Sequence, residues 1–294
     1  MKRDNVSNCD AKNIYLTNGA GEGVKLVFSM LIRGANDGIM IPIPQYPLYS
    51  ALITLNGGTQ ISYYLDEEKN WSLDTNDVKK KIEDSKKAGI DIRCIVIINP
   101  GNPTGQVLSR GNIEEIIDIC YKNNILIIAD EVYQNNVYKK GAEFISFRKV
   151  LNEMPDVIKN SVEVLSLNSV SKGLLGECGF RGGYMEAHNL DEFASEQLYK
   201  LKSVELCSNT IGQVSTLLLV DPPKRGVESD ATVDLYEKEK SDIFKGLSTR
   251  ADLLTSTFNE MRNTTCSEIQ GAMYAFPRIH LSQSAIKAAR DQGM

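Results

Sequence analysis

The sequence contains few of the residues that bind transition metals. Only two histidines, His188 and His280, occur among its 294 residues. Its six cysteines are scattered, and no two of them have the C-x-x-C spacing. A zinc site built from histidine and cysteine is therefore not expected. Cys94 and Cys120 lie within apolar patterns, which is typical of free buried thiols in a reducing compartment.

A surplus of positive charge and long apolar runs are also missing. The net charge of -5 disfavours a nucleic-acid partner. The longest apolar stretches, 94–98 and 125–129, are as long as a strand, whereas a membrane helix needs about 20 residues. The first ten residues contain neither the apolar core of a signal peptide nor an Arg/Ser-rich transit pattern, so a cytoplasmic location and no membrane partner are expected.

Two common nucleotide-binding signatures do not occur. The sequence has no G-x-x-x-x-G-K-[ST] motif and no G-x-G-x-x-G after a first strand, which disfavours nucleotide binding. With 42% hydrophobic and 24% charged residues, the composition is that of an ordinary globular protein. The length allows one large domain, or a large domain and a small one.

Strand-like and helix-like segments alternate along the first two thirds of the chain, which predicts a mostly parallel sheet with helices on both faces. Polar residues recur just after these strands, at the edge where open α/β sheets bind ligands. After residue 190 the sequence is mainly helical, with a long helical pattern from about 233 to 262 and a loop and strand at 271–279. The predicted strands are 14–16, 39–43, 61–65, 94–98, 125–129 and 162–167.

Lys172 follows the last of these strands in the context Ser-x-Ser-Lys-Gly. A lysine amine forms Schiff bases with carbonyl compounds, including pyridoxal phosphate, once it has lost its proton. A polar strand end beside Gly173 offers both access and partial burial. Taken alone, the motif also fits a solvated surface lysine.

Asp130 follows four apolar residues, at a depth where an ionised carboxylate needs a partner. The pyridinium nitrogen of pyridoxal phosphate is such a partner, and an acidic residue keeps that ring protonated as an electron sink. Tyr133 lies three residues later and could donate to the ring oxygen of the cofactor. The alternatives are a carboxylate that caps a loop and an ordinary half-buried tyrosine.

The segment Gly19-Ala20-Gly21 precedes an amphipathic helix pattern. Backbone N–H groups at a helix start form a phosphate site, and small residues let the phosphate approach. Ser169 and Arg181 could add charge-assisted bonds. Tyr46 lies in a loop at the same sheet edge and could stack on an aromatic ring, or simply pack on neighbouring prolines.

Together, these segments identify a family by their order along the chain. The sequence resembles the fold-type I pyridoxal-phosphate aminotransferases, and among them it is similar to the alanine aminotransferases, from about Leu16 to Arg278. The Ser-x-Ser-Lys and Asn-Pro-Thr-Gly motifs alone are typical of the whole superfamily, and the other segments are narrower. The segments that carry the resemblance are MIPIPQYPLYSA (40–51), NPGNPTGQV (99–107), ADEVYQNNVY (129–138), SVSKG (169–173), GECGFRGGYM (176–185) and QGAMYAFPR (270–278).

The resemblance implies a role for each candidate residue. Lys172 would hold the cofactor and shuttle a proton, and Asp130 would pair with the ring nitrogen. Asn102 and Tyr133 would bond the ring oxygen, while Tyr46 would stack on the ring. The phosphate would be held by Ala20, Gly21, Ser169 and Arg181.

The implied reaction is a ping-pong exchange between amino acids and 2-oxo acids. L-alanine would give pyruvate, and 2-oxoglutarate would then become L-glutamate. A homodimer is also implied, because active sites of this family lie at the subunit interface. A glutamate–glyoxylate aminotransferase and a cofactor-binding fragment without turnover are the alternatives.

The fold implied by the resemblance is a three-layer α-β-α large domain with a mostly parallel mixed sheet, over residues 1–238. A partial small α+β domain is expected over residues 239–294. Chains of this family are longer at both ends, so the sequence is expected to be truncated relative to them. The family's arginine for the substrate carboxylate is expected outside this sequence, and Arg278 is not assigned to that role.

Overall fold

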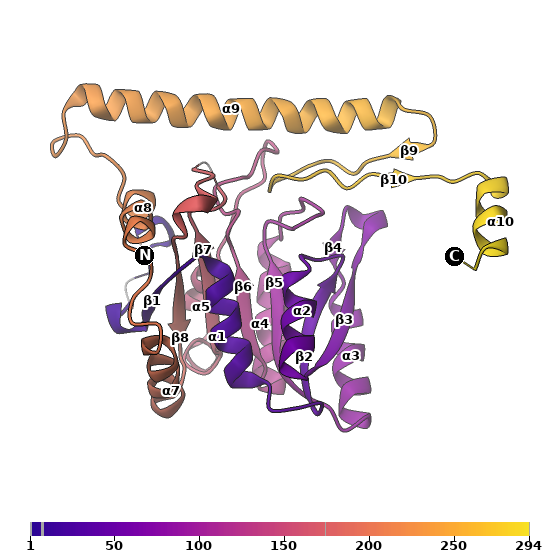
Figure 1. Cartoon of the computed structure of the whole chain (residues 1–294), viewed down its shortest axis with the longest axis horizontal. Helices are drawn as coiled ribbons and strands as arrows, with labels where there is room; N and C mark the ends of the chain where they lie inside the picture. Colours follow the sequence, from indigo (N-terminus) through magenta and orange to yellow (C-terminus); the bar gives the residue numbers. More distant parts are fainter. Residues whose placement is uncertain (1, 7–8, 174, 294) are drawn as a thin grey trace.

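The computed structural model of the chain describes residues 2–6, 9–173 and 175–293. Within them, a mixed sheet with the strand order β1-β8-β7-β6-β5-β2-β3-β4 forms the centre (Figure 1). Strands β7, β6, β5, β2 and β3 are parallel, and β8, β1 and β4 pair antiparallel towards the edges. The bounds are β1 (Ile14–Thr17), β2 (Asp37–Ile43), β3 (Thr59–Asp66), β4 (Ser72–Leu73), β5 (Asp91–Ile98), β6 (Leu126–Asp130), β7 (Val164–Ser169) and β8 (Gly183–His188).

Helices cover both faces of the sheet, which confirms the predicted α/β fold of three layers (Figure 1). One face is covered by α1 (Ala20–Leu31), α2 (Leu48–Asn56) and α7 (Glu192–Ser203). The other face is covered by α3 (Thr75–Lys87), α4 (Arg110–Asn123) and α5 (Phe147–Glu153). Short elements complete this part: η1 (Lys2–Asp4), η2 (Ala11–Asn13), η3 (Glu67–Lys69), α6 (Asp156–Lys159) and η4 (Cys178–Phe180).

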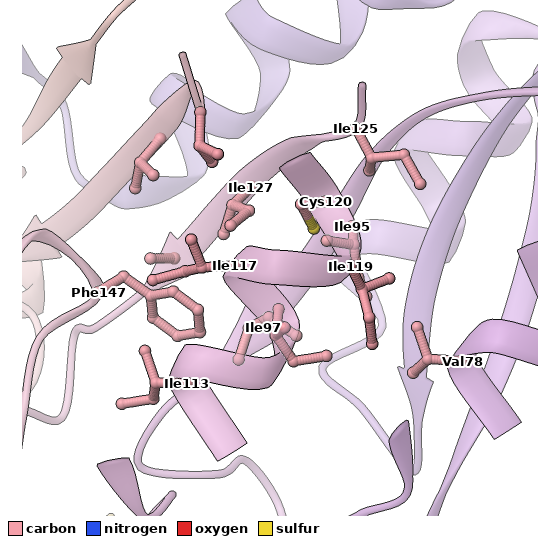
Figure 2. Close-up of a cluster of buried hydrophobic side chains, with 14 of the residues drawn as sticks. Val78, Ile95, Ile97, Ile113, Ile117, Ile119, Cys120, Ile125, Ile127 and Phe147 are labelled. Carbon is pink, nitrogen blue, oxygen red and sulfur yellow. The ribbon is translucent and has the colours of Figure 1, made fainter. Parts of the chain in front are cut away.

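The α4 helix shows how the sequence pattern creates the core. Ile113, Ile116, Ile117 and Cys120 recur with helical spacing and are all buried in one cluster with residues of β5 and β6. Figure 2 shows Ile113, Ile117 and Cys120 in this cluster. Burying one such isoleucine side chain stabilises the fold by about 1.5–3 kcal/mol. The Ser109 hydroxyl accepts a hydrogen bond from the Asn112 amide and caps the start of the helix.

Strand β8 was not among the predicted strands. It lies between β7 and β1, and its residues on one side are the polar Tyr184, Glu186 and His188. Because one face of β8 is polar, its sequence lacks the apolar run by which a buried strand is recognised. The structure accommodates this polarity with a buried ion pair of 3.0 Å between Glu186 and Arg148 of α5.

The last third of the chain is extended and largely exposed. Helix α8 (Thr210–Val220) leads into α9 (Asp230–Glu260), of which only Val233 and Ala251 are buried. In Figure 1, α9 spans the edge of the sheet where the parallel strands end, and β9 (Thr264–Thr265), β10 (Arg278–Ile279) and α10 (Gln283–Asp291) follow it. The expected domain boundary at residue 238 lies inside α9 and stays a prediction.

The described part of the chain contains neither a membrane-spanning helix nor a cluster of metal ligands. Among these residues, no helix combines the length and the apolar content that crossing a bilayer requires. Over the same ranges, His, Cys, Asp and Glu side chains form no group of three or more that could hold a metal ion.

Candidate active site

Three neighbouring parallel strands bring the predicted site together. Ile98 at the end of β5 is paired with Asp130 at the end of β6, and Asp130 is paired with Leu167 of β7. The loop with Asn102, the segment after Asp130 and the turn with Lys172 therefore leave the sheet at one edge. This is the edge at which parallel sheets bind their ligands.

Asp130 is fully buried at the bottom of this edge. Its Oδ2 accepts a hydrogen bond of 2.5 Å from the Tyr49 hydroxyl of α2, and the Val132 amide is 3.4 Å from its Oδ1. Burial raises the pKa of Asp130 above its ordinary value, while the bond from Tyr49, the Val132 amide and the charge of Lys172 oppose that rise. A cation placed at this carboxylate would lower its pKa again, as a pyridinium nitrogen would.

The amine of Lys172 lies above two tyrosines that contact each other. Its Nζ is 5.7 Å from the centroid of the Tyr133 ring and 3.5 Å from the hydroxyl of Tyr274. The two tyrosine hydroxyls are 2.7 Å apart. Burial raises the pKa of Tyr133 far above its usual value, so Tyr133 keeps its proton and can donate it. The structure thus brings Lys172, Asp130 and Tyr133 together.

Tyr274 was not among the predicted site residues. It reaches Lys172 from a segment about 100 residues further along the chain. The sequence does mark its position, because Tyr274 lies within QGAMYAFPR (270–278), one of the segments that carry the family resemblance. Arg278 itself forms ion pairs with Glu67 and Glu68, away from Lys172.

The turn before α1 forms the opposite end of the site. Gly19 has a φ of 92°, which favours glycine, and α1 begins at Ala20 without a side-chain cap. The amides of Ala20 and Gly21 belong to the first helical turn, where amides have no intrahelical acceptor. A Cβ added to Gly19 would lie 2.8 Å from the Arg181 guanidinium, so this turn and this cation are in direct contact.

Arg181 is held by backbone carbonyls and by close packing of glycines. Its Nη2 donates to the Asn18 carbonyl at 2.5 Å and its Nη1 to the Cys178 carbonyl at 2.9 Å. A Cβ added to Gly212 at the start of α8 would lie 2.3 Å from the Arg181 carbonyl. Helix α8 therefore rests directly on the backbone that presents Arg181.

The remaining predicted residues, Ser169, Tyr46 and Asn102, have fewer direct contacts with Lys172, Asp130 and Tyr133 in the described part of the chain. The Ser169 hydroxyl donates to the Gly182 carbonyl and accepts from the Ser171 amide, both at 3.1 Å. Tyr46 is 46% exposed and adds a smaller electrostatic contribution to the raised pKa of Tyr133, after burial and Tyr274. Asn102 is half-buried in the loop after β5, and within the described residues it forms no hydrogen bond with Tyr133 or Lys172.

Comparison with known proteins identifies this arrangement. Residues 1–293 match the family model "Aminotransferase class I and II". The chain belongs to this family. A protein of Dictyostelium discoideum named "Probable alanine aminotransferase, mitochondrial" is 47% identical over 100% of this chain and 54% of its own length. "Glutamate--glyoxylate aminotransferase 1" of Arabidopsis thaliana is 45% identical, over 97% of this chain and 58% of its own length.

Solved structures of aminotransferases have the same fold. The alanine aminotransferase of Pyrococcus furiosus superposes with a TM-score of 0.80 and 28% identity, over 96% of this chain and 64% of that one. An Escherichia coli aminotransferase superposes with a TM-score of 0.79 and 26% identity, covering all of this chain and 64% of that one. The chain spans about half the length of the curated relatives that it matches.

Aminotransferases of this family depend on pyridoxal phosphate. The donors and acceptors of the site fit that cofactor at both ends. Asp130 offers a buried acceptor for a ring nitrogen, and Tyr133 offers a donor for a ring oxygen. At the other end, the amides at the start of α1 follow directly on the Gly19 turn that contacts the Arg181 guanidinium, and both groups suit a phosphate.

Proposed function

We propose that this chain binds pyridoxal phosphate on Lys172 and carries out the transamination of an alanine aminotransferase. L-alanine would give pyruvate, and 2-oxoglutarate would become L-glutamate, in a ping-pong exchange. The observation that carries the proposal is the position of Lys172, above Tyr133 and at the same sheet edge as the buried Asp130. The 47% identity to a relative named alanine aminotransferase supports the choice of substrates.

The proposed chemistry divides among residues of this chain. When bound, the cofactor supplies an electron sink for the bond between the substrate Cα and its hydrogen. Lys172 Nζ would take the proton from the substrate Cα and later release it, as a general base and then a general acid. Asp130 would pair with the protonated ring nitrogen, and the Tyr133 hydroxyl would donate a hydrogen bond to the ring oxygen.

The other predicted residues bind and orient. The amides of Ala20 and Gly21 and the Arg181 guanidinium would hold the phosphate, with the Ser169 hydroxyl beside them. Tyr46 would stack on one face of the ring, and Asn102 would bond the ring oxygen. The burial of Asp130 would exclude water from its charged pair with the ring nitrogen.

Borohydride trapping tests the central claim. Mixing the chain with pyridoxal phosphate should produce a visible absorbance band, and reduction should fix one cofactor on Lys172, which peptide mapping would locate. Lys172→Ala should lose the band and the trapped adduct. Lys200→Ala, which removes an exposed lysine of α7, should keep both. Equal trapping by Lys172→Ala and the unchanged chain would disprove the proposal.

Two alternatives share cofactor binding but differ in the reaction after it. The 45% identity to a glutamate–glyoxylate aminotransferase favours a different donor and acceptor pair. A fragment that binds cofactor without turnover is the other alternative. Single-turnover spectroscopy distinguishes them, because saturating alanine should remove the band and release about one equivalent of pyruvate. A response only to glutamate would favour the exchange with glyoxylate, and no response to any donor would favour the fragment.

We also propose a homodimer and a cytoplasmic location. The exposed apolar residues of α8 support self-association. The location rests on the sequence alone, and some relatives are named mitochondrial. Fluorescence microscopy of the tagged protein in its own cells would test it.

A further inference from the structure

The hydroxyl of Tyr274 lies between two groups of the proposed site. It is 3.5 Å from Lys172 Nζ and 2.7 Å from the Tyr133 hydroxyl. The rings of Tyr133 and Tyr274 are nearly perpendicular, with their centroids 5.8 Å apart. A protonated lysine can only donate, so towards Lys172 the Tyr274 oxygen acts as an acceptor.

The donors and acceptors around Tyr274 also determine the direction in which its hydroxyl proton points. Its own proton is available to the Tyr133 oxygen at 2.7 Å, and Tyr274 must be the donor of this contact whenever the Tyr133 proton points to the cofactor. The Tyr133 proton is then free to point away from Tyr274, towards the place of the cofactor's ring oxygen. The three groups form one directed chain, from Lys172 to Tyr274 to Tyr133, and each bond in such a chain strengthens the next.

The segment that carries Tyr274 is fixed by backbone bonds on both sides. The Gly271 amide donates to the Gly105 carbonyl at 2.8 Å, and the Ala272 amide donates to the Asn136 carbonyl at 2.9 Å. The Tyr138 hydroxyl donates to the Ala272 carbonyl at 2.7 Å. These bonds tie the segment to the loops after β5 and β6, so the position of the Tyr274 ring is set by two loops of the site.

We propose that Tyr274 is a positioning residue, which orients the proton of Tyr133 towards the cofactor and holds the amine of Lys172. The inference rests on the proposed function and deepens it. Tyr274 acts through Tyr133 and Lys172, and its hydroxyl, rather than its ring, is the part that matters. The substitution Tyr274→Phe therefore isolates the role, because it keeps the ring and removes one oxygen.

The effect of Tyr274→Phe on the bound cofactor has a defined direction. Loss of the bond to the Tyr133 oxygen makes Tyr133 a weaker donor, so negative charge on the ring oxygen is stabilised less. The midpoint of the pH titration of the visible band should rise, by up to about half a pH unit. Tyr133→Phe should raise it further, and Tyr274→Phe should add less than about a third of its own shift in the Tyr133→Phe background.

A second measurement needs no cofactor. The Tyr274 oxygen accepts a hydrogen bond from the Lys172 amine, so its removal leaves that amine less restrained and more open to a reagent. At a fixed pH, acetylation of Lys172 in the cofactor-free chain should be about two- to threefold faster in Tyr274→Phe, measured by mass spectrometry. Tyr138→Phe is the matched control, because Tyr138 contacts the same segment but not Lys172. It should change both measurements much less than Tyr274→Phe, because the backbone bonds of Gly271 and Ala272 still hold the segment.

The outcomes separate this inference from the proposed function. If the unchanged chain forms no band and no adduct on Lys172, the proposed function fails and the inference with it. If the chain binds cofactor but Tyr274→Phe titrates and labels like the unchanged chain, only the inference is overturned. Equal shifts in Tyr138→Phe and Tyr274→Phe would also overturn it, since they would trace the effect to docking of the segment.

Discussion

Two adjacent carboxylates have different roles because their surroundings differ. Asp130 and Glu131 follow one another, but they point to opposite faces of the sheet. Asp130 meets Tyr49 and the candidate site, whereas Glu131 accepts a 2.9 Å bond from the Phe147 amide at the start of α5. Burial raises the pKa of Glu131 to about 8. The first carboxylate belongs to the candidate site, and the second makes stability depend on pH.

We expect the free energy of unfolding to fall as the pH rises from about 5 to 8. In that range the folded chain keeps a proton on Glu131 that the unfolded chain, with an ordinary value of 4.5, has released. Below that range both states hold the proton. Glu131→Gln should reduce the slope by about 1 kcal/mol per pH unit.

Urea unfolding at several pH values would measure this slope. Glu143→Gln, at an exposed position in the same part of the chain, should leave it unchanged. An identical slope in Glu131→Gln and the unchanged chain would show that Glu131 is ionised in the folded state at neutral pH.

At the scale of elements, the segment 270–274 completes the site although it forms no helix or strand. It lies between the loops after β5 and β6, with Ala272 fully buried at a φ of 60°. A Cβ added to Gly271 would lie 2.5 Å from the Asn136 carbonyl, so only glycine fits at this crossing. The position of Tyr274 therefore depends on the backbone at Gly271.

Gly271→Ala is expected to loosen this segment without unfolding the sheet. Trypsin or chymotrypsin should cut between residues 261 and 278 several-fold faster than in the unchanged chain, and the cofactor titration should shift as in Tyr274→Phe. Gly111→Ala is the control, because a Cβ there meets only the Ser109 hydroxyl, 4.0 Å away. An unchanged cleavage rate in Gly271→Ala would show that the two loops can move apart enough to accommodate the added methyl group.

At the scale of the whole molecule, one helix exposes several apolar side chains in succession. Helix α8 exposes apolar side chains along most of its length, and more than half of each is accessible. Exposed apolar patches of this kind mark interaction surfaces in soluble proteins. The exposed residues of α8 are Ile211, Val214, Leu217, Leu218 and Val220.

We expect the chain to associate through α8. Sedimentation at micromolar concentration should give a mass above the 32.6 kDa of one chain. The double substitution Val214→Ser and Leu218→Ser should shift the mass towards the monomer, because these residues share one helical face. Leu55→Ser, at an exposed position on α2, should have no effect. A monomer at every concentration would contradict the prediction.

Much of the fold could be predicted from the sequence, because its signals are local. Apolar runs predicted β5 and β6, and helical spacing from Ile113 to Cys120 predicted α4. Strand β8 was missed, since its polar residues are buried through Arg148 of a distant helix. Roles for Asn102, Tyr46 and Ser169 rest on the resemblance and stay predictions.

The sequence by itself determined the alternation of strands and helices, and so the edge at which Asp130 and Lys172 would lie, because parallel strands all end on one side of a sheet. Only the tertiary structure decided what surrounds them. It placed the Tyr49 hydroxyl on Asp130, the Gly19 turn against Arg181 and the Tyr274 hydroxyl beside Lys172. Each of these contacts joins residues from different elements. It therefore depends on tertiary packing and cannot be recognised from the local spacing of apolar residues.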